Sequence, residues 1–161
     1  MEDASVKIIE YVDEYAGTLS DIITRNLLEV NIKDYSEEEI ERLVLEFTVD
    51  KIMDNSKHRK IFIAIMGNTP IGTLSVTKSW GGEDGDYHFL TIFVLPEYHN
   101  KGVGRLLIEE GERYVHQNKG CKITIPSSIT AHKFYNKMGY QYNNGICQVN
   151  SDGLFIMIKF L

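Results

Sequence analysis

Residues 93–107 (FVLPEYHNKGVGRLL) have the composition and spacing of a site for a phosphorylated ligand. The stretch begins in residues 88–94, whose aromatic and β-branched side chains are typical of a strand. It ends in Val103–Gln117, where apolar residues recur at helical spacing. Gly102 and Gly104 lie at the junction. Glycine lets the backbone approach a ligand, and the first amides of a helix have no intrahelical partner.

Free amides and the positive end of a helix dipole favour phosphate, and Lys101 and Arg105 add positive charge nearby. A Walker-type loop is excluded because Arg105 and Leu106 follow Gly104, where that loop needs Lys and then Ser or Thr. A dinucleotide fingerprint needs a third glycine where Leu107 stands. A turn that binds nothing remains the plain alternative. The residues predicted to hold a pyrophosphate are His99, Asn100, Lys101, Gly102, Val103, Gly104 and Arg105.

The composition predicts one ordinary soluble domain over residues 1–161, with 43% hydrophobic and 25% charged residues. We expect no membrane span, because the longest apolar runs are only strand-sized. The acidic start does not resemble a signal peptide, so a cytoplasmic location is expected. Cys121 and Cys147 have no partners at metal-ligand spacing, and buried structural thiols are expected there, without a metal.

The net charge of −6 argues against nucleic acid as a partner, but the charge is unevenly distributed. Residues 1–50 hold 14 acids and 4 bases, a balance of −10. Residues 91–140 hold 4 acids and 7 bases, a balance of +3, and they include the predicted phosphate site.

The remaining patterns predict a mixed α/β domain in the order β-α-α-β-β-β-α-β-α-β-β. Ser36 and Glu39 have the spacing of a capping box at the start of a second helix whose apolar face reaches Ile52. Ser127 or Ser128 is expected to cap the last helix, after a strand that Pro126 halts. The other elements are strands at residues 6–11, 59–66, 70–77, 122–125, 141–149 and 154–160, a helix at 18–30, and a loop at 80–85.

A second motif follows the first, with Ala131, Phe134-Tyr135 and Gly139-Tyr140 in order. Together the two motifs resemble the GCN5-related N-acetyltransferases (the GNAT family) over about residues 87–140. That family's coenzyme A loop has Gln or Arg, two residues, Gly, one residue, and Gly or Ala. Here His99 stands in place of Gln or Arg, and Ser128 in place of the family's Asn.

The resemblance implies a V-shaped split between the strands at 88–94 and 122–125. Pantetheine would lie there, against the backbone of Ile92, Phe93 and Val94 and near Ser128 and Tyr135. It also implies Tyr135 as the general acid and an oxyanion contact from a strand amide near Val94. His88 stands where many relatives carry a Glu base, and a structural histidine is an equal alternative. Asp86 and Glu83 are the reserve candidates for the base.

The implied activity is acetyl-CoA-dependent N-acetyl transfer to a primary amine, on a small molecule or a peptide, in a ternary complex. Two alternatives remain: use of another acyl-CoA, and a CoA-binding regulatory module without turnover. In this family the first two helices border the acceptor, so the charge of −10 favours a cationic amine. A homodimer is compatible with the sequence.

Overall fold

A seven-stranded sheet forms the centre of the computed structural model, which describes residues 5–79 and 81–161. Its strand order is β1-β2-β3-β4-β5-β7-β6, and only β4 and β5 pair in parallel. Trp80, in the predicted loop, lies outside the described residues. The strands are β1 (Val6–Glu10), β2 (Lys60–Met66), β3 (Thr69–Lys78), β4 (Asp86–Val94), β5 (Lys122–Ser127), β6 (Gln141–Tyr142) and β7 (Phe155–Phe160). The predicted mixed α/β fold with seven strands is confirmed.

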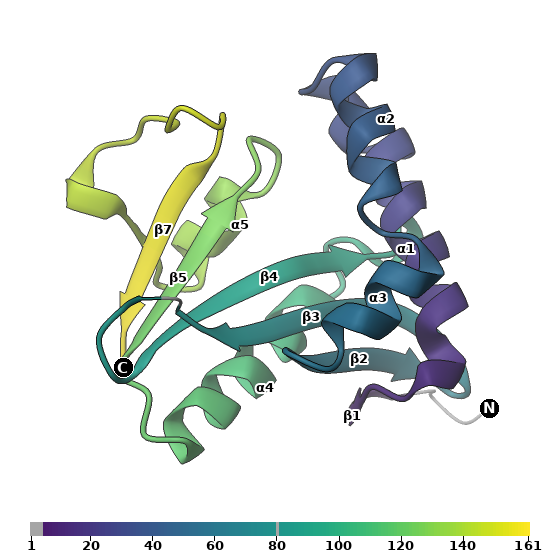
Figure 1. Cartoon of the computed structure of the whole chain (residues 1–161), viewed down its shortest axis with the longest axis horizontal. Coiled ribbons are helices and arrows are strands. Elements are labelled where there is room, and N and C mark those ends of the chain that lie inside the picture. Colours follow the sequence, from purple (N-terminus) through teal and green to yellow (C-terminus); the bar gives the residue numbers. More distant parts are fainter. Residues whose placement is uncertain (1–4, 80) are drawn as a thin grey trace.

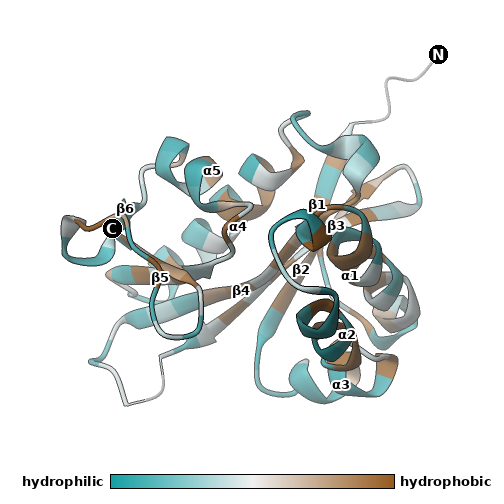
Figure 2. Ribbon diagram, turned by 90° about the horizontal axis from the view of Figure 1, so that it is seen from above, coloured by the Kyte–Doolittle hydropathy of each residue, from teal (hydrophilic) through white to brown (hydrophobic). Residues whose placement is uncertain are grey.

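Helices cover both faces of the β1–β4 part of the sheet (Figure 2). Along β2, Ile61 and Ile63 point into a core with the first three helices, whereas Phe62 and Ala64 point into a core with α4. This alternation follows from the two-residue period of a strand. The helices are α1 (Ala16–Glu29), α2 (Glu37–Leu45), α3 (Val49–Asn55), α4 (Val103–Gln117) and α5 (His132–Lys137).

The predicted second helix is two helices, α2 and α3. The capping box of Ser36 and Glu39 is present at the start of α2, as predicted. The chain leaves the helical conformation at Thr48, whose backbone is extended. The Phe47 carbonyl, which lies at this break, accepts a hydrogen bond from Ser20 Oγ at 2.7 Å. Phe47 is thereby free to pack edge-on against Phe93 of β4.

The second half of the chain also departs from three predictions. Pro126 does not halt β5, because the strand continues beside β7 to Ser127. Neither Ser127 nor Ser128 caps α5, whose N-cap is Ala131 without a side-chain hydrogen bond. The predicted strand 141–149 ends at Tyr142, because a 3-10 turn over Asn143–Gly145 follows it.

Both cysteines are exposed, so the prediction of buried thiols was wrong. Cys121 follows the turn that ends α4, and Cys147 lies in the irregular segment between β6 and β7. No helix within the described residues is long and apolar enough to cross a membrane.

Candidate active site

A V-shaped split separates β4 from β5 (Figure 1). The two strands pair only at their shared end, where Asp86, Tyr87 and His88 are the β4 partners. Beyond this point β5 continues beside β7 to Ser127, and β4 continues beside β3 to Val94. The backbone of β4 beyond His88 therefore has a free edge that faces the split.

A bulge in β4 lies beside the split. Thr91 and Ile92 together oppose the single residue Leu74 of β3, and Thr91 has a φ of 56°. An extra residue reverses the faces to which later side chains point. Phe89 accordingly belongs to the core beneath α4, whereas Phe93 packs in the core beneath α1 to α3.

The backbone of Val94 points into the split. The Leu95 amide donates to the Ile71 carbonyl at 2.8 Å, and backbone groups alternate in direction along an antiparallel pair. The Val94 carbonyl is held by His99, whose Nε2 lies 2.7 Å away. By the same alternation the backbone of Phe93 faces β3. Phe93 and Val94 were both predicted to contact pantetheine through their backbone. Of the two, Val94 is the residue whose amide faces the split.

The predicted phosphate loop has the backbone of an anion site. Asn100 and Gly102 both have positive φ values, of 60° and 83°, and turn the chain sharply into α4. The first helical hydrogen bond runs from the Leu106 amide to the Gly102 carbonyl, at 3.2 Å. Three amides before it lack a helical partner: those of Val103, Gly104 and Arg105.

Two cations stand beside these amides. Lys101 Nζ lies over the ring of Tyr98, 5.6 Å from its centroid. Arg105 is exposed in the first turn of α4 and makes no ion pair within the described residues. The loop therefore combines free amides, a helix N-terminus and two exposed positive charges, which together suit a pyrophosphate.

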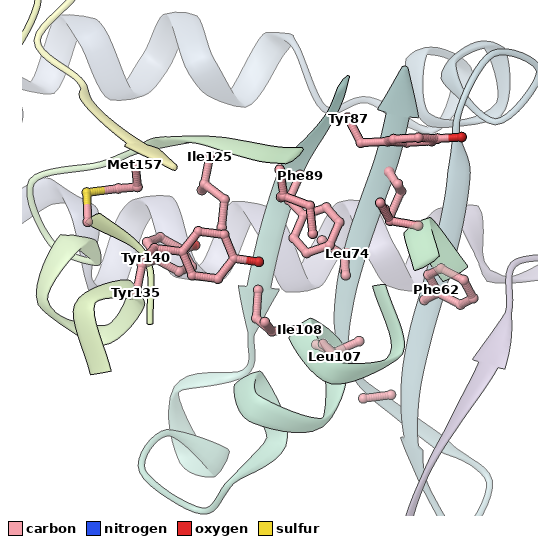
Figure 3. Packing of buried hydrophobic residues seen from close by; sticks show 14 of the residues in the cluster. Phe62, Leu74, Tyr87, Phe89, Leu107, Ile108, Ile125, Tyr135, Tyr140 and Met157 are labelled. Atoms are coloured by element: carbon pink, nitrogen blue, oxygen red, sulfur yellow. The ribbon is translucent and has the colours of Figure 1, made fainter. Parts of the chain in front are cut away.

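Tyr135 lies on α5 next to Tyr140, with ring centroids 6.3 Å apart (Figure 3). Its side chain is buried, and burial raises the pKa of Tyr135, so the phenol keeps its proton near neutral pH. The Tyr135 hydroxyl donates no hydrogen bond to another described residue, and burial is the sole cause of its raised pKa. The Tyr140 hydroxyl instead donates to Glu112 Oε1 at 3.0 Å.

The loop between β5 and α5 contacts the segment between α1 and α2. The Ile129 amide donates to the Tyr35 hydroxyl at 2.9 Å, and Thr130 Oγ1 donates to Asp34 Oδ2 at 2.7 Å. These bonds join the two arms of the sheet on one side of the split. Ser128, predicted to contact pantetheine, is half-buried in this loop.

A groove approaches β4 from the face covered by α1 to α3. It consists of two hollows of about 490 and 470 Å³ that share Asn55, Arg59 and Leu90. One hollow reaches the bulge at Thr91 and the other reaches His88. Volumes of this size suit a small molecule or a short peptide end.

His88 is half-buried in this groove, and burial lowers the pKa of its imidazole. Asp86 opposes this change and Lys122 adds to it, so the net effect favours a neutral ring. Of the reserve candidates, Asp86 is paired with Lys122 at 3.8 Å, and Glu83 is exposed outside both hollows. Within the described residues no three metal-ligating side chains gather.

Comparison with known families decides the assignment. The family model described as an acetyltransferase (GNAT) domain matches residues 31–156, most of the chain. The chain belongs to the GNAT family. A search of curated proteins finds no match for it. The shared GNAT fold is also seen in solved structures.

Three of these structures illustrate the likeness. The PaiA N-acetyltransferase of Thermoplasma acidophilum, in complex with coenzyme A, is 20% identical, with a TM-score of 0.83 over 98% of this chain and 99% of that one. A GCN5-related N-acetyltransferase from Rhodopseudomonas palustris is 23% identical, with a TM-score of 0.81 over 100% and 99%. A GNAT acetyltransferase from Brucella melitensis, in complex with acetyl-CoA, is 16% identical, with a TM-score of 0.67 over 98% and 88%.

Sequence reasoning did not identify Arg59 and Asn55 as residues of the groove. Arg59 immediately precedes β2 and Asn55 ends α3, positions that carry no motif. Both come close to the bulge only through the packing of α3 on the sheet. The GNAT motifs concern the other side of the split, so they give no information about this groove.

Proposed function

We propose that this GNAT protein transfers the acetyl group of acetyl-CoA to a primary amine of a small molecule or peptide. One observation carries the proposal. The free amides at the start of α4 and the unpaired edge of β4 are connected by the segment Leu95–Gly102, which His99 ties back to Val94, so we infer that they border the same split. A groove reaches the other side of β4 at the bulge.

The residues present fit the parts of acetyl-CoA. The amides of Val103, Gly104 and Arg105 would hold the pyrophosphate, and Lys101 would add charge. The Val94 amide would hold the pantetheine or the thioester oxygen in the split. His99 supports this arrangement indirectly, because its bond to the Val94 carbonyl ties the loop to the strand.

The transfer needs attack by a neutral amine on the thioester carbon. A bond forms from the amine nitrogen to the acetyl carbon, the carbon–sulfur bond breaks, the amine loses one proton and the departing sulfur gains one. His88, whose lowered pKa favours a neutral ring, is the acceptor proposed for the amine proton. Tyr135, which keeps its proton, is the donor proposed for the sulfur. No covalent intermediate with the protein is required.

The direct experiment measures thiol release from acetyl-CoA against a panel of primary amines, with mass spectrometry of the acetylated product. We expect amine-dependent release that saturates in both substrates, with intersecting initial-rate plots. Parallel plots would indicate an acetylated protein and contradict direct attack. Faster release from succinyl-CoA than from acetyl-CoA would favour another acyl donor.

A CoA-binding module without turnover is the second candidate, because the phosphate loop alone would be enough to bind coenzyme A. In that case the parent and Tyr135→Phe bind acetyl-CoA with the same affinity. With either protein, no amine raises thiol release above the uncatalysed rate.

A further inference from the structure

Arg59 occupies a central place in the acceptor groove. It lines both large hollows, together with Asn55 and Leu90. It also lines a small cavity next to Thr91 and Phe47, beneath the bulge of β4. Its side chain is half-buried, and burial lowers the pKa of the guanidinium, which nevertheless remains charged at neutral pH.

The charge of Arg59 is not neutralised by the described residues. None of the eight ion pairs includes Arg59, and its side chain makes no hydrogen bond there. The two acids that line the groove already have partners: Glu46 lies 3.2 Å from Lys51 and Asp54 lies 3.6 Å from Lys57. A partly buried cation without a counter-charge costs free energy, and a bound anion would remove that cost.

The acids that favoured a cationic acceptor are largely occupied elsewhere. Asp13 accepts from the Tyr11 hydroxyl at 3.0 Å, and Glu29 pairs with Arg25 at 3.1 Å. Asp34 accepts from Thr130, as described above. None of these three lines the groove. Of the described acids in residues 5–50, Glu46 alone lines either hollow, so most of the charge of −10 counted over residues 1–50 lies outside the groove.

We propose that the acceptor is an amine that also carries a carboxylate, and that Arg59 binds this carboxylate while the amine faces β4 between His88 and Thr91. This inference rests on the proposed acetyl transfer and names the class of its acceptor. The planar guanidinium matches the two oxygens of a carboxylate. The two hollows of the groove connect Arg59 with Thr91 and with His88. One small molecule can therefore contact Arg59 with its carboxylate and β4 with its amine.

The test compares acceptors that differ only in the carboxylate. Lysine and 1,5-diaminopentane form one pair, and dipeptides with a free or an amidated C-terminus form others. Thiol release should show a KM at least about tenfold lower for the carboxylate member of the preferred pair, since a charged hydrogen bond contributes a factor of about 10 to 100. Arg59→Met should abolish this preference, and Arg59→Lys should retain part of it.

Matched controls separate this effect from general damage. Arg42→Met removes an exposed arginine that lines neither hollow, so it should keep the preference. Acetyl-CoA affinity, measured by calorimetry, should be the same in all three variants. Equal use of lysine and diaminopentane, or a preference that survives in Arg59→Met, overturns the inference and leaves acetyl transfer intact. Stronger use of phosphoethanolamine than of β-alanine also overturns it. Thiol release that no amine increases overturns the proposed function itself.

Discussion

The ring of Phe134 lies against the backbone of Gly104, so that a Cβ atom added at Gly104 would stand only 3.0 Å from Phe134 Cζ. Gly104 belongs to the first motif and Phe134 to the second. Their contact joins the start of α4 to α5, and it places the phosphate loop beside the helix that carries Tyr135. The φ of Gly104 is not in the left-handed region, so the backbone conformation does not demand glycine here. The close approach of Phe134 is what favours glycine at this position.

We predict that Gly104→Ala destabilises the protein by up to about 2 kcal/mol. Overpacking costs about 1–3 kcal/mol, and the better helix propensity of alanine returns about 1 kcal/mol. Urea unfolding measures the change. In a Phe134→Leu background the added methyl has room, so the cost of Gly104→Ala should largely disappear. Strictly additive effects would show that the two residues do not restrain each other.

The charge of the phosphate loop gives a second prediction. Lys101→Gln combined with Arg105→Gln should weaken acetyl-CoA binding by about tenfold or more at low salt, because two cations beside the pyrophosphate are lost. The difference from the parent should shrink as salt rises, because both side chains are exposed. Calorimetry at two salt concentrations measures this. Lys57→Gln removes an exposed charge outside the loop, next to the end of α3, and should bind acetyl-CoA like the parent.

The family and the mixed α/β fold could be predicted from the sequence, because short-range patterns carry both. A helix begins at Val103 after the two-glycine loop, and Ser36 caps α2, as local spacing alone had indicated. The helix break at Thr48 was not predictable in this way. A long-range contact accompanies the break: the hydroxyl of Ser20, 28 residues before Thr48, donates to the Phe47 carbonyl.

Exposure and ion pairing also escaped prediction. Cys121 and Cys147 are apolar in composition tables, yet both are exposed, Cys121 after the turn that ends α4 and Cys147 in an irregular segment. Asp34 reads as a spare acid in the sequence, and only the fold brings Thr130 to it from 96 residues away. The acceptor groove is built from such long-range neighbours, which explains why its central cation had no signal in the sequence.

Tyr135 and Tyr140 provide a contrast between catalysis and stability. Tyr135→Phe should lower turnover by about 10²–10⁴-fold, the range of general acid catalysis, with little change in acetyl-CoA affinity or unfolding. Tyr140→Phe should instead cost about 1–3 kcal/mol of stability, because Glu112 loses a hydrogen-bond donor, while turnover stays near that of the parent. Steady-state rates and urea unfolding of both variants give the comparison. Turnover of Tyr135→Phe within twofold of the parent would assign Tyr135 to the core alone.

The pH dependence of transfer tests His88. Burial lowers its pKa below the ordinary value of about 6.5, so the ring is neutral and able to accept a proton above that pH. As the pH falls through the lowered pKa, the ring becomes charged and kcat/KM should fall with it. The midpoint of this acidic limb should therefore lie below about pH 6.5. In His88→Gln the rate should drop and the acidic limb should disappear, because glutamine does not titrate. Asp86→Asn is the matched control: it removes the neighbouring charge that raises the pKa of His88, so the limb should persist with its midpoint moved to lower pH. A limb that survives unchanged in His88→Gln would assign the proton to another group, and His88 would then be a structural residue of the groove.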